Sequence, residues 1–132
     1  MVLRVIATGL CLAASSCSAL PGFGPERPLF PTVWVYKSSG AIQCRTSGVP
    51  LDVMQRELAV EDVEVFASCR TGDGMLHSAV CGASAGLVNA YEIDQRDLPK
   101  AITLGFAELS KSPGHKGKSL QQILGEECFQ RT

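Results

Sequence analysis

Residues 62–74 read DVEVFASCRTGDG, and this stretch decides the fold that we predict for the chain. Apolar and polar side chains alternate over its first nine residues, as in a β-strand with one buried face. The Asp73-Gly74 pair then favours a tight hairpin turn, because glycine accepts the positive φ that such turns require. We therefore expect residues 75–81 to return as the partner strand. The side chains expected to share one face of the first strand are Val63, Val65, Ala67 and Cys69.

The segments on both sides of this stretch predict two helices and further strands. Pro50 suits the first turn of a helix, and apolar residues at helical spacing continue it over residues 51–60. A second, short helix is expected before Gly105, with Asp94 as its N-cap. Further strands are expected at residues 32–37, 41–44, 87–93 and 106–109. The predicted fold class is α+β: a small two-layer sandwich with two helices on one face of a mainly antiparallel sheet, in a ferredoxin-like-type order β-α-β-β-β-α.

The first twenty residues have the pattern of an export signal. Arg4 precedes an apolar run over residues 5–14, and small residues follow it. A basic start, a short apolar segment and a small-residue site are typical of a secretory signal peptide. Serines interrupt the run before it reaches the ~20 apolar residues of a membrane-spanning helix. We therefore expect residues 1–16 to be a cleaved signal peptide.

The end of this signal, Ala14-Ser15-Ser16-Cys17, resembles the lipobox of bacterial lipoprotein precursors. The resemblance implies cleavage before Cys17 and acylation of its thiol, and the serine that follows is similar to the residue found in proteins sorted to the outer membrane. One acyl chain gives only marginal membrane binding, whereas a triacylated cysteine is a stable anchor. Cleavage after Ala19 is the alternative, and it leaves a soluble periplasmic protein.

The remaining cysteines predict disulfides. The chain has six cysteines, of which two lie in the first seventeen residues. An even set in an exported chain indicates two disulfides, and four cysteines allow three pairings that the sequence does not separate. In a core this small, disulfides worth ~2–4 kcal/mol each contribute much of the stability. The candidates are Cys44, Cys69, Cys81 and Cys128.

Composition predicts one folded domain between a tether and a tail. Residues 17–31 are rich in Pro and Gly and predict a tether. Residues 32–109 hold the expected α+β domain, and residues 110–132 are expected to be a polar C-terminal tail. The chain has 12 Lys+Arg against 13 Asp+Glu, and this balance argues against a nucleic-acid partner, which requires a basic surface.

Residues 82–86 match G-x-S-x-G, the pattern around the nucleophilic serine of α/β-hydrolases, with Ser84 at its centre. Asp94 or Asp97, followed by His115, gives the chain order of a catalytic triad. However, a strand is expected after the motif where the hydrolase pattern requires a helix, and no glycine-rich oxyanion loop precedes it. We therefore expect a loop at this position.

Two other sets of side chains are candidates for a nucleophile or metal site and for a binding surface. His77 and Cys81 would suit a thiol nucleophile, and together with Cys69 they are soft metal ligands. Disulfide formation removes the thiolates, and the spacing matches no familiar zinc pattern. Trp34 and Tyr36 share one face of a predicted strand, as core cover or as an exposed binding stripe. We expect no catalytic residue, no metal site and no cofactor.

Short pieces of residues 39–109 resemble small exported proteins of unknown function from Gram-negative bacteria. The pieces are GAIQC at 40–44, DGM at 73–75, AVCG at 79–82 and LGF at 104–106. The resemblance implies an envelope location and a compact disulfide-bearing domain. It implies no particular activity, because the function of those proteins is unknown.

These patterns predict an exported envelope lipoprotein, anchored in the outer membrane and facing the periplasm, that acts as a non-enzymatic binding or structural module. Its expected partners are the membrane, through the lipid anchor, and an envelope protein or a cell-wall component. The alternative hypothesis is a small periplasmic hydrolase with Ser84 or Cys81 as nucleophile. A third hypothesis is an inhibitor of another envelope enzyme.

Overall fold

The computed structural model of the chain describes residues 28–129. Its helices and strands follow in the order β1 (Thr32–Ser38), α1 (Leu51–Val60), β2 (Val65–Gly72), β3 (Leu87–Asp94), α2 (Leu98–Thr103), β4 (Ala107–Glu108) and α3 (Leu120–Phe129). Short 3-10 helices join them at η1 (Gln95–Asp97), η2 (Leu109–Lys111) and η3 (Pro113–His115). The predicted signal peptide, Cys17 and all but the last residues of the predicted tether lie outside the described residues.

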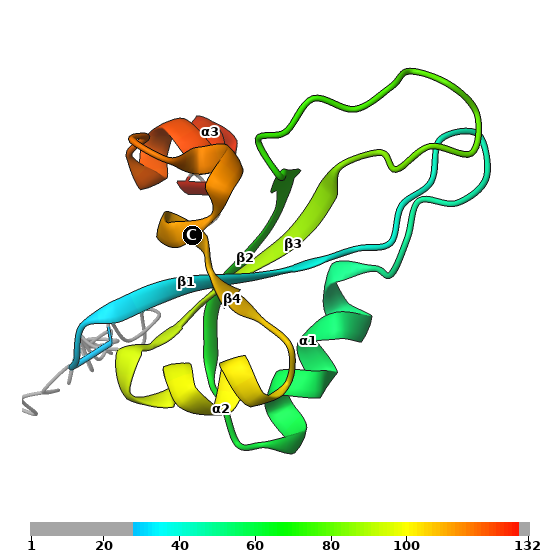
Figure 1. The fold of residues 1–132 in the computed structure, drawn as a ribbon. Coiled ribbons are helices and arrows are strands. Elements are labelled where there is room, and N and C mark those ends of the chain that lie inside the picture. Colours follow the sequence, from blue (N-terminus) through cyan, green and yellow to red (C-terminus); the bar gives the residue numbers. More distant parts are fainter. Residues whose placement is uncertain (1–27, 130–132) are drawn as a thin grey trace, which may run out of the picture.

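The four strands form one antiparallel sheet in the order β2-β3-β1-β4 (Figure 1). β1 pairs with β3 over its whole length, from Thr32 opposite Asp94 to Ser38 opposite Val88. Most of β3 is buried, as expected for a central strand with partners on both sides. The structure confirms the α+β class and the antiparallel sheet, although the element order differs from the predicted β-α-β-β-β-α.

The order differs because the strand predicted at residues 75–81 is not formed. β2 pairs with β3, and residues 73–86 form a long loop between them. The Asp73 carboxylate accepts a hydrogen bond from the Met75 N–H (2.8 Å), and the Asp73 N–H donates to the Gly86 carbonyl (2.8 Å). These bonds close the base of a long loop where the sequence pattern predicts a two-residue turn.

α1 and α2 cover one face of the sheet. α1 has the predicted bounds and begins directly after Pro50. The Asp94 side chain accepts a hydrogen bond from the Arg96 N–H (2.8 Å), and thereby caps the turn that leads into α2, as predicted. The buried residues of this core are Val35, Met54, Leu58, Val63, Tyr91, Ile93, Ala101 and Phe106.

The second face of the sheet is covered by residues 109–129, most of which we expected to belong to a polar tail. α3, which is kinked at Gly125, packs against β2. Trp34 and the partly buried Tyr36 face this core, as expected of core cover. Helical segments therefore cover both faces of the sheet in the described residues, and not one face as predicted. The buried residues of the second core are Trp34, Ala90, Leu109, Ile123, Leu124 and Cys128.

A β-bulge in β2 decides which side chains reach which core. The pairing register with β3 shifts between Val65 and Ala67. Val65 packs against the core of α1 and α2, whereas Ala67 and Cys69 pack against the core of α3. A bulge inserts one residue and therefore inverts the alternation beyond it. The prediction that these three side chains share one face is wrong for this reason.

Tyr91 gives the fold a testable pH dependence. Its side chain is fully buried, and its hydroxyl donates a hydrogen bond to the Leu51 carbonyl (2.7 Å). Burial, assisted by the negative charge of Glu57, raises the pKa of Tyr91 from 10.0 to about 12. Because the unfolded chain loses this proton near pH 10, the contribution to stability is complete below pH 10 and disappears as the pH rises through about 12.

We therefore expect the free energy of unfolding to fall more steeply between pH 10 and about 12 in the wild type than in Tyr91→Phe. Urea titrations of both proteins at several pH values measure the two slopes. Equal slopes would show that Tyr91 ionises as easily in the folded chain as in the unfolded chain.

Candidate functional site

Two loops lie side by side beyond one end of the sheet (Figure 1). They are residues 39–49, between β1 and α1, and residues 73–86, between β2 and β3. We call these two loops the arm. Their backbones are hydrogen-bonded: the Gln43 N–H donates to the Ala83 carbonyl (2.9 Å), and the Gly82 N–H donates to the Gln43 carbonyl (3.0 Å). The arm is therefore one braced structure and not two independent loops.

The strand expected at residues 41–44 is reduced to isolated bridges within the arm. Ile42 bridges to Ser84 in the other loop and to Thr46 in its own loop. The Thr46 N–H also donates to the Ile42 carbonyl (3.1 Å). The chain therefore turns back at once and leaves too few residues for a strand.

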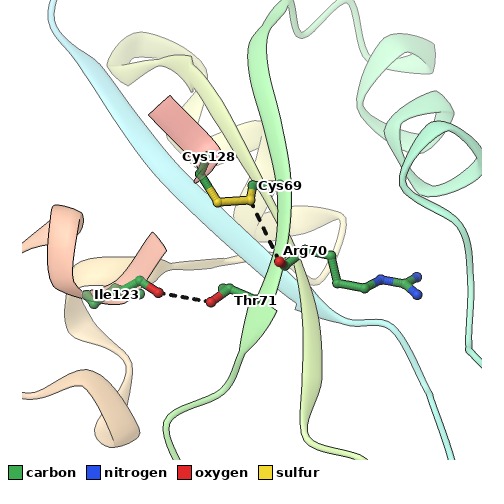
Figure 2. Close-up of a disulfide and its surroundings, with 5 residues drawn as sticks. All are labelled: Cys69, Arg70, Thr71, Ile123 and Cys128. Carbon is green, nitrogen blue, oxygen red and sulfur yellow. Dashed lines mark hydrogen bonds between the residues drawn. A yellow bond between two sulfur atoms is a disulfide. The ribbon is translucent and has the colours of Figure 1, made fainter. Parts of the chain in front are cut away.

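Two disulfides brace the domain, and all four candidate cysteines take part in them. Cys44–Cys81 joins the two loops of the arm, with Cα atoms 5.1 Å apart. Cys69–Cys128 joins β2 to α3, with Cα atoms 5.6 Å apart (Figure 2). Both separations are usual for disulfides. Cys81 therefore carries no free thiol that could act as a nucleophile.

Side chains of β2 bind neighbouring segments on both sides of the sheet (Figure 2). On the side of α3, the Thr71 hydroxyl donates to the Ile123 carbonyl (2.9 Å), next to the Cys69–Cys128 disulfide. Arg70 points to the opposite side. Its guanidinium donates to the Ser47 carbonyl (2.9 Å) in the arm, and it also donates to the buried side chain of Asn89 (3.0 Å). Arg70 thereby fixes the end of loop 39–49 to the sheet.

The base of loop 73–86 is clamped against η3. A Cβ atom at Gly74 would overlap the carbonyl oxygen of Gly114, and a Cβ atom at Gly114 would overlap the carbonyl oxygen of Asp73. His115 is 4% exposed, and its Nε2–H donates to the Gly72 carbonyl (3.0 Å). Two backbone segments meet here at a distance that leaves no room for side chains, so the base of the loop is held in place.

A hydrogen bond between Asp73 and His77 within the loop was not foreseen from the sequence. His77 Nε2 lies 2.7 Å from Asp73 Oδ2, and a Cβ atom at Gly86 would overlap the imidazole ring. A spacing of four residues indicates contact only in a helix, so the pattern carried no signal. An aspartate that orients a histidine is part of hydrolase triads. In the part of the chain that the structure describes, however, no serine or cysteine side chain is hydrogen-bonded to His77.

The residues whose chain order matches that of a catalytic triad are not hydrogen-bonded to one another in the described residues. Ser84 Oγ accepts a hydrogen bond from the backbone N–H two residues further on (3.1 Å). Asp94 lies at the opposite end of β3, where hydrogen bonds from Arg96 hold the pKa of its carboxyl below the ordinary value. Asp97 forms an ion pair with a lysine of α2 (2.9 Å). Within residues 28–129, neither carboxylate is hydrogen-bonded to His115 or Ser84.

The arm exposes apolar side chains on loop 73–86. Leu76 is fully exposed (103%), and Met75 and Val80 are more than half exposed. The stretch from Gly74 to Gly86 contains no Asp, Glu, Lys or Arg. Met75, Leu76 and Val80 therefore offer apolar surface that the rest of the described domain does not cover.

The described part of the chain contains no group of three His, Cys, Asp or Glu side chains that could hold a metal ion. No helix there is both long enough and apolar enough to span a bilayer. Comparison of the chain with protein families, with curated proteins and with solved structures found no match.

Proposed function

We propose that the protein is an exported, lipid-anchored binding module of the bacterial outer membrane, without enzymatic activity. The two disulfides are the observation that carries this proposal, because paired cysteines persist in oxidising compartments and are rare in the cytosol. Cys17 is the acylated residue, and residues 17–31 tether the domain on the periplasmic side.

The arm supports a binding role over a catalytic role. It is fixed by a disulfide and by backbone hydrogen bonds, yet it presents Met75, Leu76 and Val80 to solvent. Exposed apolar clusters on otherwise polar surfaces mark interaction sites. An envelope protein or a cell-wall component is the class of partner that we propose.

The position of the arm suits a module that is anchored through its N-terminus. The described chain begins just before β1, and the arm follows the other end of β1 (Figure 1). The eleven peptide units from residue 17 to residue 28 can span at most ~40 Å when extended. An anchor at Cys17 would therefore hold the domain near the membrane and would be attached to it at the end of β1 opposite to the arm.

We further propose that the domain is an elaborated ferredoxin-like fold. The order β1-α1-β2-β3-α2-β4 is that of a split β-α-β arrangement, and α1 and α2 share one face of the sheet. In this proposal, residues 109–129 are an addition that covers the opposite face.

The lipid anchor is tested with Cys17→Ser in cells that are fed a labelled fatty acid. We expect the wild type to take up the label and to fractionate with the outer membrane, and Cys17→Ser to lose the label, because the acyl chains are attached to this thiol. Cys11→Ser is the matched control, since it removes another leader cysteine, and it should behave as the wild type does. Unchanged labelling and fractionation of Cys17→Ser would remove the anchor from the proposal.

The hydrolase alternative is tested with activity probes on the native oxidised protein. We expect neither a fluorophosphonate nor iodoacetamide to label it, since Ser84 has no hydrogen-bonded base in the described residues and Cys81 is in a disulfide. Stoichiometric fluorophosphonate labelling that Ser84→Ala abolishes would replace the binding module with the enzyme.

A further inference from the structure

We propose that loop 73–86 is a substrate-like inhibitory loop, and that Leu76 enters the primary specificity pocket of a serine endopeptidase. The inference rests on the proposed binding function and names the partner. That partner is a peptidase whose pocket accepts a medium-sized apolar side chain, and whose active site would meet the peptide bond between Leu76 and His77.

The exposure of Leu76 is the first observation behind this assignment. Its side chain is fully exposed on a loop that the structure holds in place, so no packing within the described domain explains an apolar residue there. Burying such a side chain in a partner contributes ~1.5–3 kcal/mol. A few residues that fill pockets near the centre of an interface carry most of its binding energy.

The restraint on both sides of Leu76 is the second observation. On the N-terminal side, the Asp73 carboxylate accepts the Met75 N–H (2.8 Å) and pairs with His77 (2.7 Å), so it spans the proposed reactive bond. On the C-terminal side, the Gln43 side chain donates to the Ser78 carbonyl (3.0 Å). The Cys44–Cys81 disulfide then holds the chain three residues further on. A segment ordered before binding avoids most of the entropy cost of association.

The backbone at this point is open to a partner strand. Residues 76–79 run without helix, turn or bend, and the backbone groups of Leu76 and His77 form no hydrogen bond with other described residues. Peptides that add to a sheet edge of a partner use such free backbone groups, and pockets for side chains give the specificity. In serine endopeptidases, the pocket for the residue before the cleaved bond sets specificity.

The same restraints explain how the loop would inhibit the peptidase without being cleaved and released as a substrate. Hydrolysis of the Leu76–His77 bond by water gives a carboxylate on Leu76 and an amine on His77. Both ends remain attached to the domain, one through β2 and the other through Cys81 and its disulfide. The new ends therefore stay at high effective concentration, and re-formation of the bond competes with release.

The chemistry of the loop favours a peptidase over a lipid surface. Between Gly74 and Gly86 there is no Lys or Arg to attract anionic headgroups. The arm also lies at the end of β1 opposite to the point where the chain enters the domain, so it is not the part of the domain next to the proposed anchor (Figure 1).

The test measures inhibition by the mature, oxidised protein in detergent, with chymotrypsin, subtilisin and trypsin as probes. We expect inhibition of chymotrypsin or subtilisin, whose pockets take apolar side chains, and none of trypsin, whose pocket holds an aspartate. Leu76→Lys should weaken the inhibition of chymotrypsin or subtilisin at least ~100-fold, because it removes a central anchor of the interface. The same variant should inhibit trypsin. Val60→Lys is the matched control, because Val60 is also exposed but lies at the end of α1, outside the arm, and it should leave the inhibition constant unchanged within about threefold.

Three outcomes would overturn the inference. The first is the absence of inhibition both by the wild type and by Leu76→Lys at ~10 μM, well above the range of ordinary protease–inhibitor affinities. The second is rapid turnover of the loop as an ordinary substrate, and the third is an equal loss of inhibition in Leu76→Lys and Val60→Lys. Self-association or vesicle binding through Leu76 in place of inhibition would likewise overturn it. If Cys17 is still acylated and Ser84 is unreactive in such a case, the proposed binding module stands and only its partner is wrong.

Discussion

Replacing Cys69 and Cys128 together by alanine is expected to lower the free energy of unfolding by about 4 kcal/mol. The bond closes a long loop, with a sequence separation of 59, and it is the covalent link between α3 and the sheet. Its loss removes the constraint on the unfolded chain and loosens the cover over Trp34, the single tryptophan. Urea titration monitored by tryptophan fluorescence measures both effects, and we expect red-shifted emission from the native variant.

The matched control is removal of Cys44–Cys81, whose sequence separation of 37 predicts a comparable entropic loss. This disulfide lies in the exposed arm and not in either core, so native tryptophan emission should stay as in the wild type. A Cys69→Ala/Cys128→Ala protein with wild-type stability and emission would show that α3 covers the sheet without this bond.

Gly74→Ala is expected to destabilise the protein by ~2–5 kcal/mol. Its φ of +76° costs an alanine ~1–2 kcal/mol, and overlap of the new methyl group with the Gly114 carbonyl adds ~1–3 kcal/mol. Gly40→Ala is the control, because Gly40 has a similar φ of +71° but no atom within 4 Å of its built Cβ. The difference between the two losses, measured by urea titration, isolates the close approach at the base of the arm. Equal losses would show that η3 does not clamp the loop.

The elements with a strong local signal were predictable. α1 follows from Pro50 and apolar residues at helical spacing, and the cap at Asp94 follows from its own side chain. β1 and β3 are rich in β-branched and aromatic residues, and they lie close to where the pattern placed them. In each of these cases the residues that determine the element lie within it.

The predictions that failed depend on contacts between distant residues. The strand expected at residues 75–81 is lost because the Asp73 carboxylate and the Cys44–Cys81 disulfide hold that segment in the arm. α3 has only a weak apolar stripe, and its burial depends on the space over Trp34 and on Cys69, which faces it only because of the bulge in β2. Alternation within a segment contains none of this information.

The candidate site was predictable in its chemistry and not in its arrangement. The count of cysteines indicated two disulfides, but the pairing required the structure. Leu76 carries no signal in the sequence, because a leucine in an expected strand is ordinarily a core residue. Its proposed role depends on the structure, which shows that the loop is braced on both sides while the side chain stays in solvent.

Mass spectrometry of the protein purified from its native cells, without reductant, tests the central claim most directly. We expect a mature chain that begins at an acylated Cys17, and disulfide-linked peptides that join Cys44 to Cys81 and Cys69 to Cys128. A chain that still begins at Met1 and carries every cysteine as a free thiol would contradict both the export of this protein and the braced arm on which its proposed function depends.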